Sequence, residues 1–206
     1  MAFTKTKIYN LALSHLLLSR QVSDIDTDVT TNEVKVLNTF WEDAFSATLQ
    51  DLDLDSVSET VPLELLEELS EGPWTYVYKY PSDCNFFRRI VSDVTKDNRR
   101  THIPKRVGIH NGNKVIFTNK CQASAELIPE DIDLSFLETN AGLAISYMLA
   151  FLAAPLIVGK GAAKLKSEVY QTYLLMKDKA QEIDERENFN YDPAIVTSEF
   201  VAARME

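Results

Sequence analysis

The chain combines long segments of helical periodicity with one segment that is typical of β-strands. Its most apolar stretch is residues 135–158, in which apolar side chains recur every three or four positions. From Ala141 onward the opposite face is apolar as well, and small residues such as Gly142 and Ala153 would let neighbouring helices approach closely. This pattern predicts a helix that is buried on nearly every side, at the centre of the fold.

Three further segments have the periodicity of amphipathic helices. Residues 5–20 have a broad apolar side, and Thr4 is placed to cap their first turn. Residues 31–52 repeat apolar positions at intervals of three and four, so we expect this helix to lie against the central one. Residues 162–186 have one apolar stripe and a charged outer face, which predicts a last helix packed antiparallel to the central helix.

The character of the chain changes at residues 73–128, where aromatic and β-branched side chains predominate. The predicted strands are residues 74–80, 86–94, 106–110, 114–118 and 124–128. Asn111 and Gly112 separate two of them, and an Asn-Gly pair readily adopts the positive φ angles of a tight hairpin. Before this region, residues 62–69 begin with proline and are rich in leucine and glutamate, which predicts a short helix.

These elements predict a mainly α fold with an inserted β unit (α+β), in which a bundle of about four helices carries a small antiparallel β subdomain. The expected organisation is a first helical part at 1–72, the β subdomain at 73–128, a second helical part at 129–187 and an extended C-terminal arm at 188–206. With 206 residues, 45% of them hydrophobic, the chain can bury one sizeable core.

Charge and cysteine content narrow the class of protein further. The formal net charge is −10, which disfavours a firm grip on nucleic-acid phosphates but allows a wall past which nucleic acid slides. Basic residues of the β region are dispersed, so a solvated face or a protein contact is favoured over a nucleic-acid site. Two cysteines cannot form a disulfide framework, and free thiols fit a reducing cytoplasm. We expect no secretory signal.

The central segment has two possible interpretations, a membrane-spanning helix and a buried core helix. Residues 141–158 carry no charge and approach the roughly 20 apolar residues that cross a bilayer. Glu138 and Asn140 lie in the same predicted helix, Pro155 lies near its end, and aromatic belts are absent from its flanks. A buried core helix, without a membrane partner, is therefore the favoured interpretation.

Two acidic runs, residues 24–28 and 51–55, resemble the start of an EF-hand calcium loop. Each lacks the glycine at loop position six and the glutamate at position twelve, so we expect solvated acids at helix ends. Cys84, His102, His110 and Cys121 form a conceivable zinc set, but no two of them have the local spacing that holds zinc geometry. We therefore predict no metal.

The sequence also lacks a recognisable catalytic constellation. It contains no phosphate loop, nucleophile elbow or paired-histidine zinc motif. His15 lies on the apolar side of its predicted helix, where a satisfied core residue is favoured over a ligand. These observations predict a protein that is not an enzyme and that binds no cofactor.

The C-terminal arm is apolar although it lies beyond the last amphipathic helix. Burying each of its large side chains is worth roughly 1.5–3 kcal/mol, so these groups should fold back or occupy a groove on a partner. Its position favours a partner. The candidate assembly interface comprises Phe189, Tyr191, Phe200, Val201 and Arg204.

The order of several local patterns resembles that of a known family. The patterns are the leucine-rich segment 13–18, the acidic turn 23–28, and residues 36–41, 78–84, 133–137 and 198–204. Together they span nearly the whole chain and resemble the tail tubular protein A family, the head–tail adaptors of short-tailed bacteriophages. The acidic residues 51–55 and 62–70 depart from the family pattern.

The resemblance implies a structural protein of the virion tail or neck, assembled in the host cytoplasm. Copies of the chain, about twelve, would form a closed ring between the portal protein and a tail nozzle that is similar to tail tubular protein B. DNA would pass transiently through the ring without sequence-specific binding. The alternatives are an α-helical enzyme or regulatory protein with a scattered site, and a membrane-associated helical protein.

Overall fold

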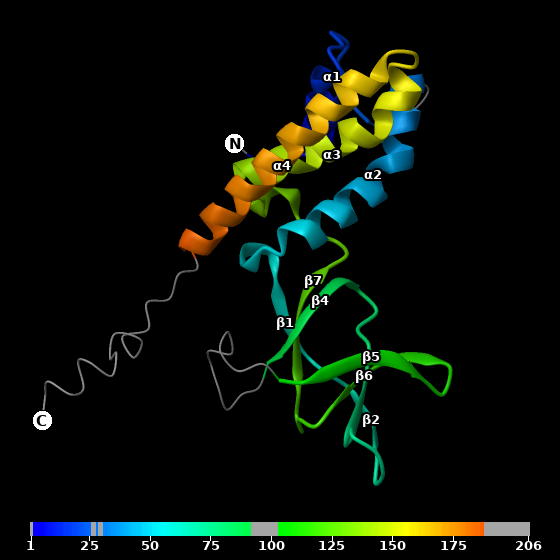
Figure 1. Cartoon of the computed structure of the whole chain (residues 1–206), viewed down its shortest axis with the longest axis vertical. Coiled ribbons are helices and arrows are strands. Elements are labelled where there is room, and N and C mark those ends of the chain that lie inside the picture. Colours follow the sequence, from blue (N-terminus) through cyan, green and yellow to red (C-terminus); the bar gives the residue numbers. More distant parts are fainter. Residues whose placement is uncertain (1, 26–27, 29–30, 92–102, 188–206) are drawn as a thin grey trace, which may run out of the picture.

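A computed structural model describes residues 2–25, 28, 31–91 and 103–187. Within these residues the chain has four α-helices and seven β-strands, so the predicted α+β class is confirmed. The helices form an elongated bundle at one end of the molecule, and the strands form two small sheets at the other end (Figure 1).

The bundle consists of α1 (Lys5–His15), α2 (Asn32–Leu52), α3 (Thr139–Ile157) and α4 (Ala162–Glu187). The predicted central helix is confirmed, because α3 contacts each of the other three helices. Its small residues allow this, and a Cβ atom added at Gly142 would lie 2.5 Å from the ring of Phe3. The short corner after α3 returns α4 alongside it in the opposite direction (Figure 1).

Local capping explains where three of the helices begin. The side chains of Thr4 and Thr31 accept backbone N–H groups in the first turns of α1 and α2. Glu138 does the same for α3, with its Oε2 atom 2.7 Å from the backbone nitrogen of Asn140. Residues 134–136, which the sequence placed within the central helix, form a separate 3₁₀ turn before it.

The strands form two antiparallel sheets. The first has the order β1-β7-β4 and contains β1 (Glu59–Pro62), β7 (Ser124–Pro129) and β4 (Cys84–Val91). The second has the order β2-β3-β6-β5 and contains β2 (Leu65–Glu68), β3 (Tyr76–Lys79), β6 (Asn113–Thr118) and β5 (Lys105–His110). The predicted hairpin is confirmed, because Asn111 and Gly112 join β5 to β6 with φ angles of 51° and 80°.

The predicted helix at 62–69 is wrong, because this segment is extended. It contains the end of β1 and all of β2, and the chain passes there from the first sheet to the second. Backbone pairing decides the outcome: β1 pairs with β7 and β2 pairs with β3, which overrides the helix preference of leucine and glutamate. The sheets therefore begin at Glu59, within the part of the chain that the sequence assigned to the helical bundle.

Two apolar cores lie under these elements. The larger one fills the helical bundle, and the smaller one is formed by the sheets, including Tyr78, Phe87 and Ile116. Among the described residues, α3 alone is long and apolar enough to cross a membrane, and 56% of its most apolar window is buried within the protein. This burial is what a core helix requires.

Candidate functional site

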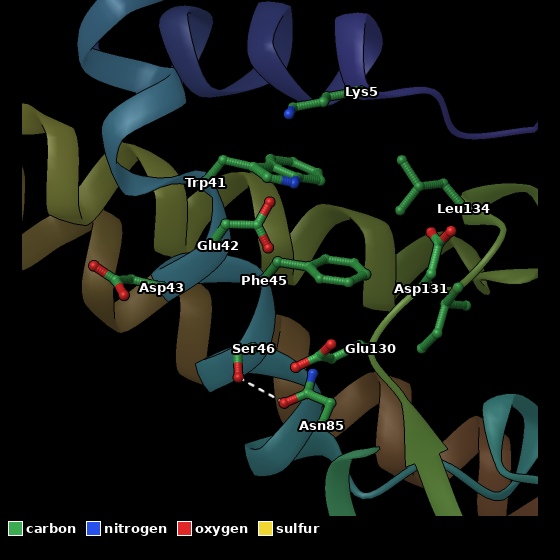
Figure 2. Close-up of a pocket in the computed structure, with 11 residues that line it drawn as sticks. Lys5, Trp41, Glu42, Asp43, Phe45, Ser46, Asn85, Glu130, Asp131 and Leu134 are labelled. Carbon is green, nitrogen blue, oxygen red and sulfur yellow. Dashed lines mark hydrogen bonds between the residues drawn. The ribbon is translucent and has the colours of Figure 1, made fainter. Parts of the chain in front are cut away.

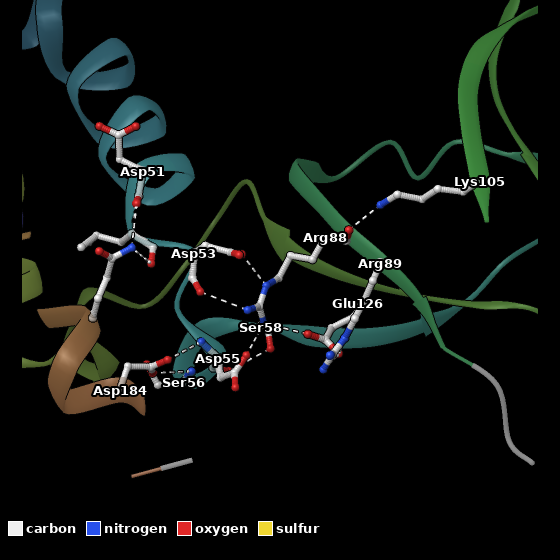
Figure 3. Close-up of polar contacts among 12 residues, drawn as sticks. Asp51, Asp53, Asp55, Ser56, Ser58, Arg88, Arg89, Lys105, Glu126 and Asp184 are labelled. Atoms are coloured by element: carbon white, nitrogen blue, oxygen red, sulfur yellow. Dashed lines mark hydrogen bonds and ion pairs between the residues drawn. The ribbon is translucent and has the colours of Figure 1, made fainter. Parts of the chain in front are cut away.

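The acidic run 51–55 meets a partly buried arginine at the junction between the bundle and the sheets (Figure 3). The run begins in the last turn of α2 and turns at Asp53, whose φ angle is 47°. Arg88 projects from β4, and its side chain is only 12% exposed. Its Nε atom lies 2.5 Å from Asp53 Oδ1, and its Nη1 atom lies 2.6 Å from Asp55 Oδ1 and 2.7 Å from Glu126 Oε1.

Helix α4 joins the same junction through two side chains. The carboxylate of Asp184 accepts the backbone N–H groups of Asp55 and Ser56 at 2.8 and 3.0 Å. The hydroxyl of Tyr173 donates to Asp51 Oδ2 at 2.7 Å, and burial raises the pKa of Tyr173. The acids at 51–55 are expected to be solvated, and Asp51 and Asp53 are indeed exposed. The sequence does not predict that the same run also connects α2, α4 and the first sheet.

Further basic groups surround this network. Arg89 contacts the second oxygen of Glu126 at 2.8 Å, and the Lys105 ammonium donates to the backbone carbonyl of Arg88. Burial lowers the pKa of Lys105 to about 8, and its Nζ atom lies 4.0 Å from the centroid of the Phe87 ring. Burial opposes the charge of Arg88 too, but its hydrogen bonds to aspartates raise its pKa. The junction is thus a set of mutually neutralising charges.

An open cleft of about 760 Å³ runs along α2 (Figure 2). Trp41 and Phe45 form its apolar wall. The carboxylates around it belong to Glu42, Asp43, Glu130 and Asp131. The Lys5 ammonium lies 4.8 Å from the Trp41 ring centroid and supplies the single positive charge among the described lining residues.

The chemistry of the cleft suits recognition of a cation better than bond cleavage. Ser46 is its only hydroxyl among the described lining residues, and it donates to Asn85 Oδ1 at 2.6 Å, so no base takes up its proton. Carboxylates beside an aromatic wall instead match the head group and the aliphatic stem of arginine or lysine. We therefore regard the cleft as a candidate contact surface for another protein.

The candidate assembly interface lies outside the described residues. Phe189, Tyr191, Phe200, Val201 and Arg204 all belong to residues 188–206. The structure therefore leaves their predicted role untested.

The conceivable zinc set is not brought together as far as it is described. The Nε2 atom of His110 contacts Glu67 Oε2 at 2.8 Å, and the Cys84 thiol lies 3.6 Å from the hydroxyl of Tyr80. Cys121 is exposed, and His102 lies outside the described residues. Among the residues that the structure describes, no three histidine, cysteine or acidic side chains form a group suited to a metal.

His15 has its polar partner within the bundle, as the sequence predicted. Its Nε2 atom lies 3.0 Å from Ser146 Oγ, and its ring stacks on Tyr147 with centroids 3.7 Å apart. Because the Ser146 hydroxyl donates to the carbonyl of Leu143, it is left to accept the Nε2–H of a neutral imidazole. Burial lowers the pKa of His15 to about 4.

Comparison with known proteins adds no further assignment. No protein-family model matches the chain, and a search of curated proteins gives no significant match. What defines the molecule is an α+β fold with a helical bundle, a pair of small sheets and a formal net charge of −10. The case for a function rests on these features and on the ordered sequence patterns.

Proposed function

We propose that this protein is a head–tail adaptor of a short-tailed bacteriophage, whose copies form a ring between the portal protein and the tail nozzle. The observation that carries the proposal is the shared order of weak motifs from residues 13–18 to residues 198–204, which resembles the tail tubular protein A family. DNA passes through the ring during ejection.

The architecture supports an adaptor because the two ends of the molecule are structurally different. The bundle and the sheets lie at opposite ends of an elongated protein (Figure 1). Each end offers a separate surface to a different neighbour. The Arg88 network links the helices to the first sheet, which suits a component that transmits position from one ring to the next.

Electrostatics support the same role. A chain with a formal net charge of −10 repels the phosphate backbone, so a channel built from it lets DNA slide without sticking. The acidic cleft along α2 adds a surface that attracts basic side chains of a partner.

The proposal is tested by mixing the purified protein with the portal protein of the same virus and measuring the mass of the complex by sedimentation. We expect the full chain to attach to the portal, and a variant ending at residue 187 to keep its helicity but fail to attach. Within the arm, Phe200→Ala with Arg204→Ala should weaken attachment. The matched control, Asp192→Ala with Glu199→Ala, should not.

Normal attachment of the truncated chain would remove the arm from the interface. Failure of the full chain to bind the portal at all would contradict the adaptor function.

A further inference from the structure

Within the part of the chain that the structure describes, the second sheet ends in two edge strands, β2 and β5. Among the described residues β2 pairs with β3 alone and β5 pairs with β6 alone. An open edge presents a row of N–H and C=O groups that can pair with a strand of another chain. Soluble proteins commonly protect such edges against pairing. The side chains of β2 and β5 therefore indicate which kind of strand each edge could accept.

Both edges combine exposed apolar side chains with charges, and the charges are opposite in sign. Strand β2 is exposed along its whole length, with Leu66 46% exposed, and it carries Glu67 and Glu68. Strand β5 carries the exposed Arg106, and its Ile109 is 79% exposed. The Lys105 ammonium on the same strand instead contacts Arg88 and Phe87 of its own chain. One edge is therefore acidic and apolar, and the other is basic and apolar.

The direction of the strands matches this complementarity. Neighbouring strands in the sheet are all antiparallel, so β2 and β5 run in opposite directions. A second copy in the same orientation can therefore place its β2 beside β5 and continue the antiparallel pattern. Pairing of two β5 edges or of two β2 edges would instead bring like charges together.

The residue rows across the sheet fix the expected register. Leu65, Tyr78, Ile116 and Val107 are successive partners in one row. The next row runs through Glu67, Val77, Phe117 and Arg106. If the added strand continues these rows, its Leu65 lies beside Val107 and its Glu67 lies beside Arg106, so apolar meets apolar and acid meets base. The Oε2 atom of Glu67 already contacts His110 Nε2 of its own chain at 2.8 Å, so its other carboxylate oxygen is the one that would face Arg106.

We propose that β2 of one copy pairs with β5 of the next copy and joins their sheets. Such a contact is heterologous, because two different surfaces meet, and it closes into a ring when the rotation between copies divides a full turn. That the contact closes into a ring rests on the proposed adaptor function. The pairing itself needs no portal, so the two can fail separately.

The test uses two single-cysteine proteins, Leu65→Cys and Val107→Cys, each in a chain whose Cys84 and Cys121 are replaced by serine. Opposed residues in an antiparallel pair have Cα atoms about 4.5–5.5 Å apart, which lies within the range that a disulfide bridges. The two proteins are mixed, and the mixture is either concentrated without portal or assembled on the portal. Each preparation is then oxidised and run on a non-reducing gel. Lys164→Cys on α4 replaces Leu65→Cys in the matched control.

We expect a cross-linked dimer in the mixture of Leu65→Cys with Val107→Cys, and none in either protein alone or in the control mixture. Glu67→Lys or Arg106→Glu should each lower the yield about tenfold, and the two together should restore it. Dimers of Val107→Cys alone, or no cross-link in either preparation, would overturn the pairing. A cross-link without attachment to the portal would keep the pairing and overturn the adaptor function.

Discussion

Helix α1 ends in a left-handed residue that is a leucine rather than a glycine. Leu17 has a φ angle of 60°, its N–H bonds to the carbonyl of Ser14, and the N–H of Leu18 bonds to the carbonyl of Leu13. This is the hydrogen-bond pattern of a Schellman motif, in which glycine is usual. Leu17 is also 82% exposed, so its side chain gains little from burial in return.

Leu17→Gly should therefore stabilise the protein. Relief of the left-handed strain is worth about 1–2 kcal/mol, and the extra freedom of glycine in the unfolded chain costs about 0.5–1 kcal/mol. We expect a net gain of about 0.5–1 kcal/mol in the free energy of unfolding, measured by urea denaturation. The control Leu17→Ala keeps the Cβ atom and should show no such gain, and equal effects of the two variants would contradict this explanation.

His15 makes stability depend on pH in a defined direction. In the unfolded chain its pKa is about 6.5, whereas burial lowers it to about 4 in the folded protein. Between these values the unfolded state binds the proton and the folded state does not, so stability falls as the pH falls from 6.5 to 4. The full shift corresponds to about 3 kcal/mol, and partial exposure should reduce this to about 1–2 kcal/mol.

The variant His15→Gln isolates this effect, because its amide can still donate to Ser146. Carboxylates titrate in both proteins, so the difference between their unfolding free energies reports His15 alone. Because only the His15 protein loses this contribution as the pH falls, the two unfolding free energies should converge. Curves that stay parallel from pH 7 to pH 4 would show that His15 does not titrate as described.

At the scale of elements, the Arg88 network is what joins the helices to the sheets. Its carboxylate partners come from the end of α2 and from β7, and Asp184 attaches α4 to the same turn. The side chains of Arg88 and Glu126 are largely removed from solvent, so each charge is tolerated in the folded protein only while its partner is present.

Arg88→Met should destabilise the protein by about 2–3 kcal/mol, because it leaves Glu126 and Asp55 without their shared cation. The measurement is urea denaturation at pH 7. Lys79→Met is the matched control, because it removes an exposed ion pair with Glu64 and should cost less than about 0.5 kcal/mol. Similar losses in the two variants would mean that the network does not hold the junction.

The sequence predicts those elements whose signals are local. Four helices, the hairpin at Asn111 and Gly112, and the central position of α3 follow from periodicity and turn chemistry. The extended segment β1–β2 does not, because its leucines and glutamates favour a helix and only distant pairing partners make it a strand. The end of α1 was placed too late, since three successive leucines at 16–18 hide the stop.

The junction could not be predicted for the same reason. Asp53 and Arg88 are far apart in the sequence, and neither acid spacing nor basic spacing indicates that they meet. The dispersed basic residues of the β region were expected to form a solvated face or a protein contact. Arg88 and Arg89 instead contact acids within the chain, whereas Arg106 lies on an exposed edge.

At the scale of the whole molecule, the proposal requires that rings form at the right place. An adaptor that closed a ring before it met the portal would have to be added as a complete unit. Weak edge pairing between β2 and β5 avoids this, because the contact forms in concentrated protein but persists at low concentration only when the portal holds neighbouring copies side by side. We therefore expect free subunits to be monomeric or weakly associated at low micromolar concentration.

The most direct measurement is electron microscopy of the protein with and without the portal protein of the same virus, at one protein concentration. The account predicts a ring of about twelve copies attached to the tail side of the portal, and no stable ring in the sample without portal. Portal particles that remain bare, or stable rings of the free protein, would contradict it.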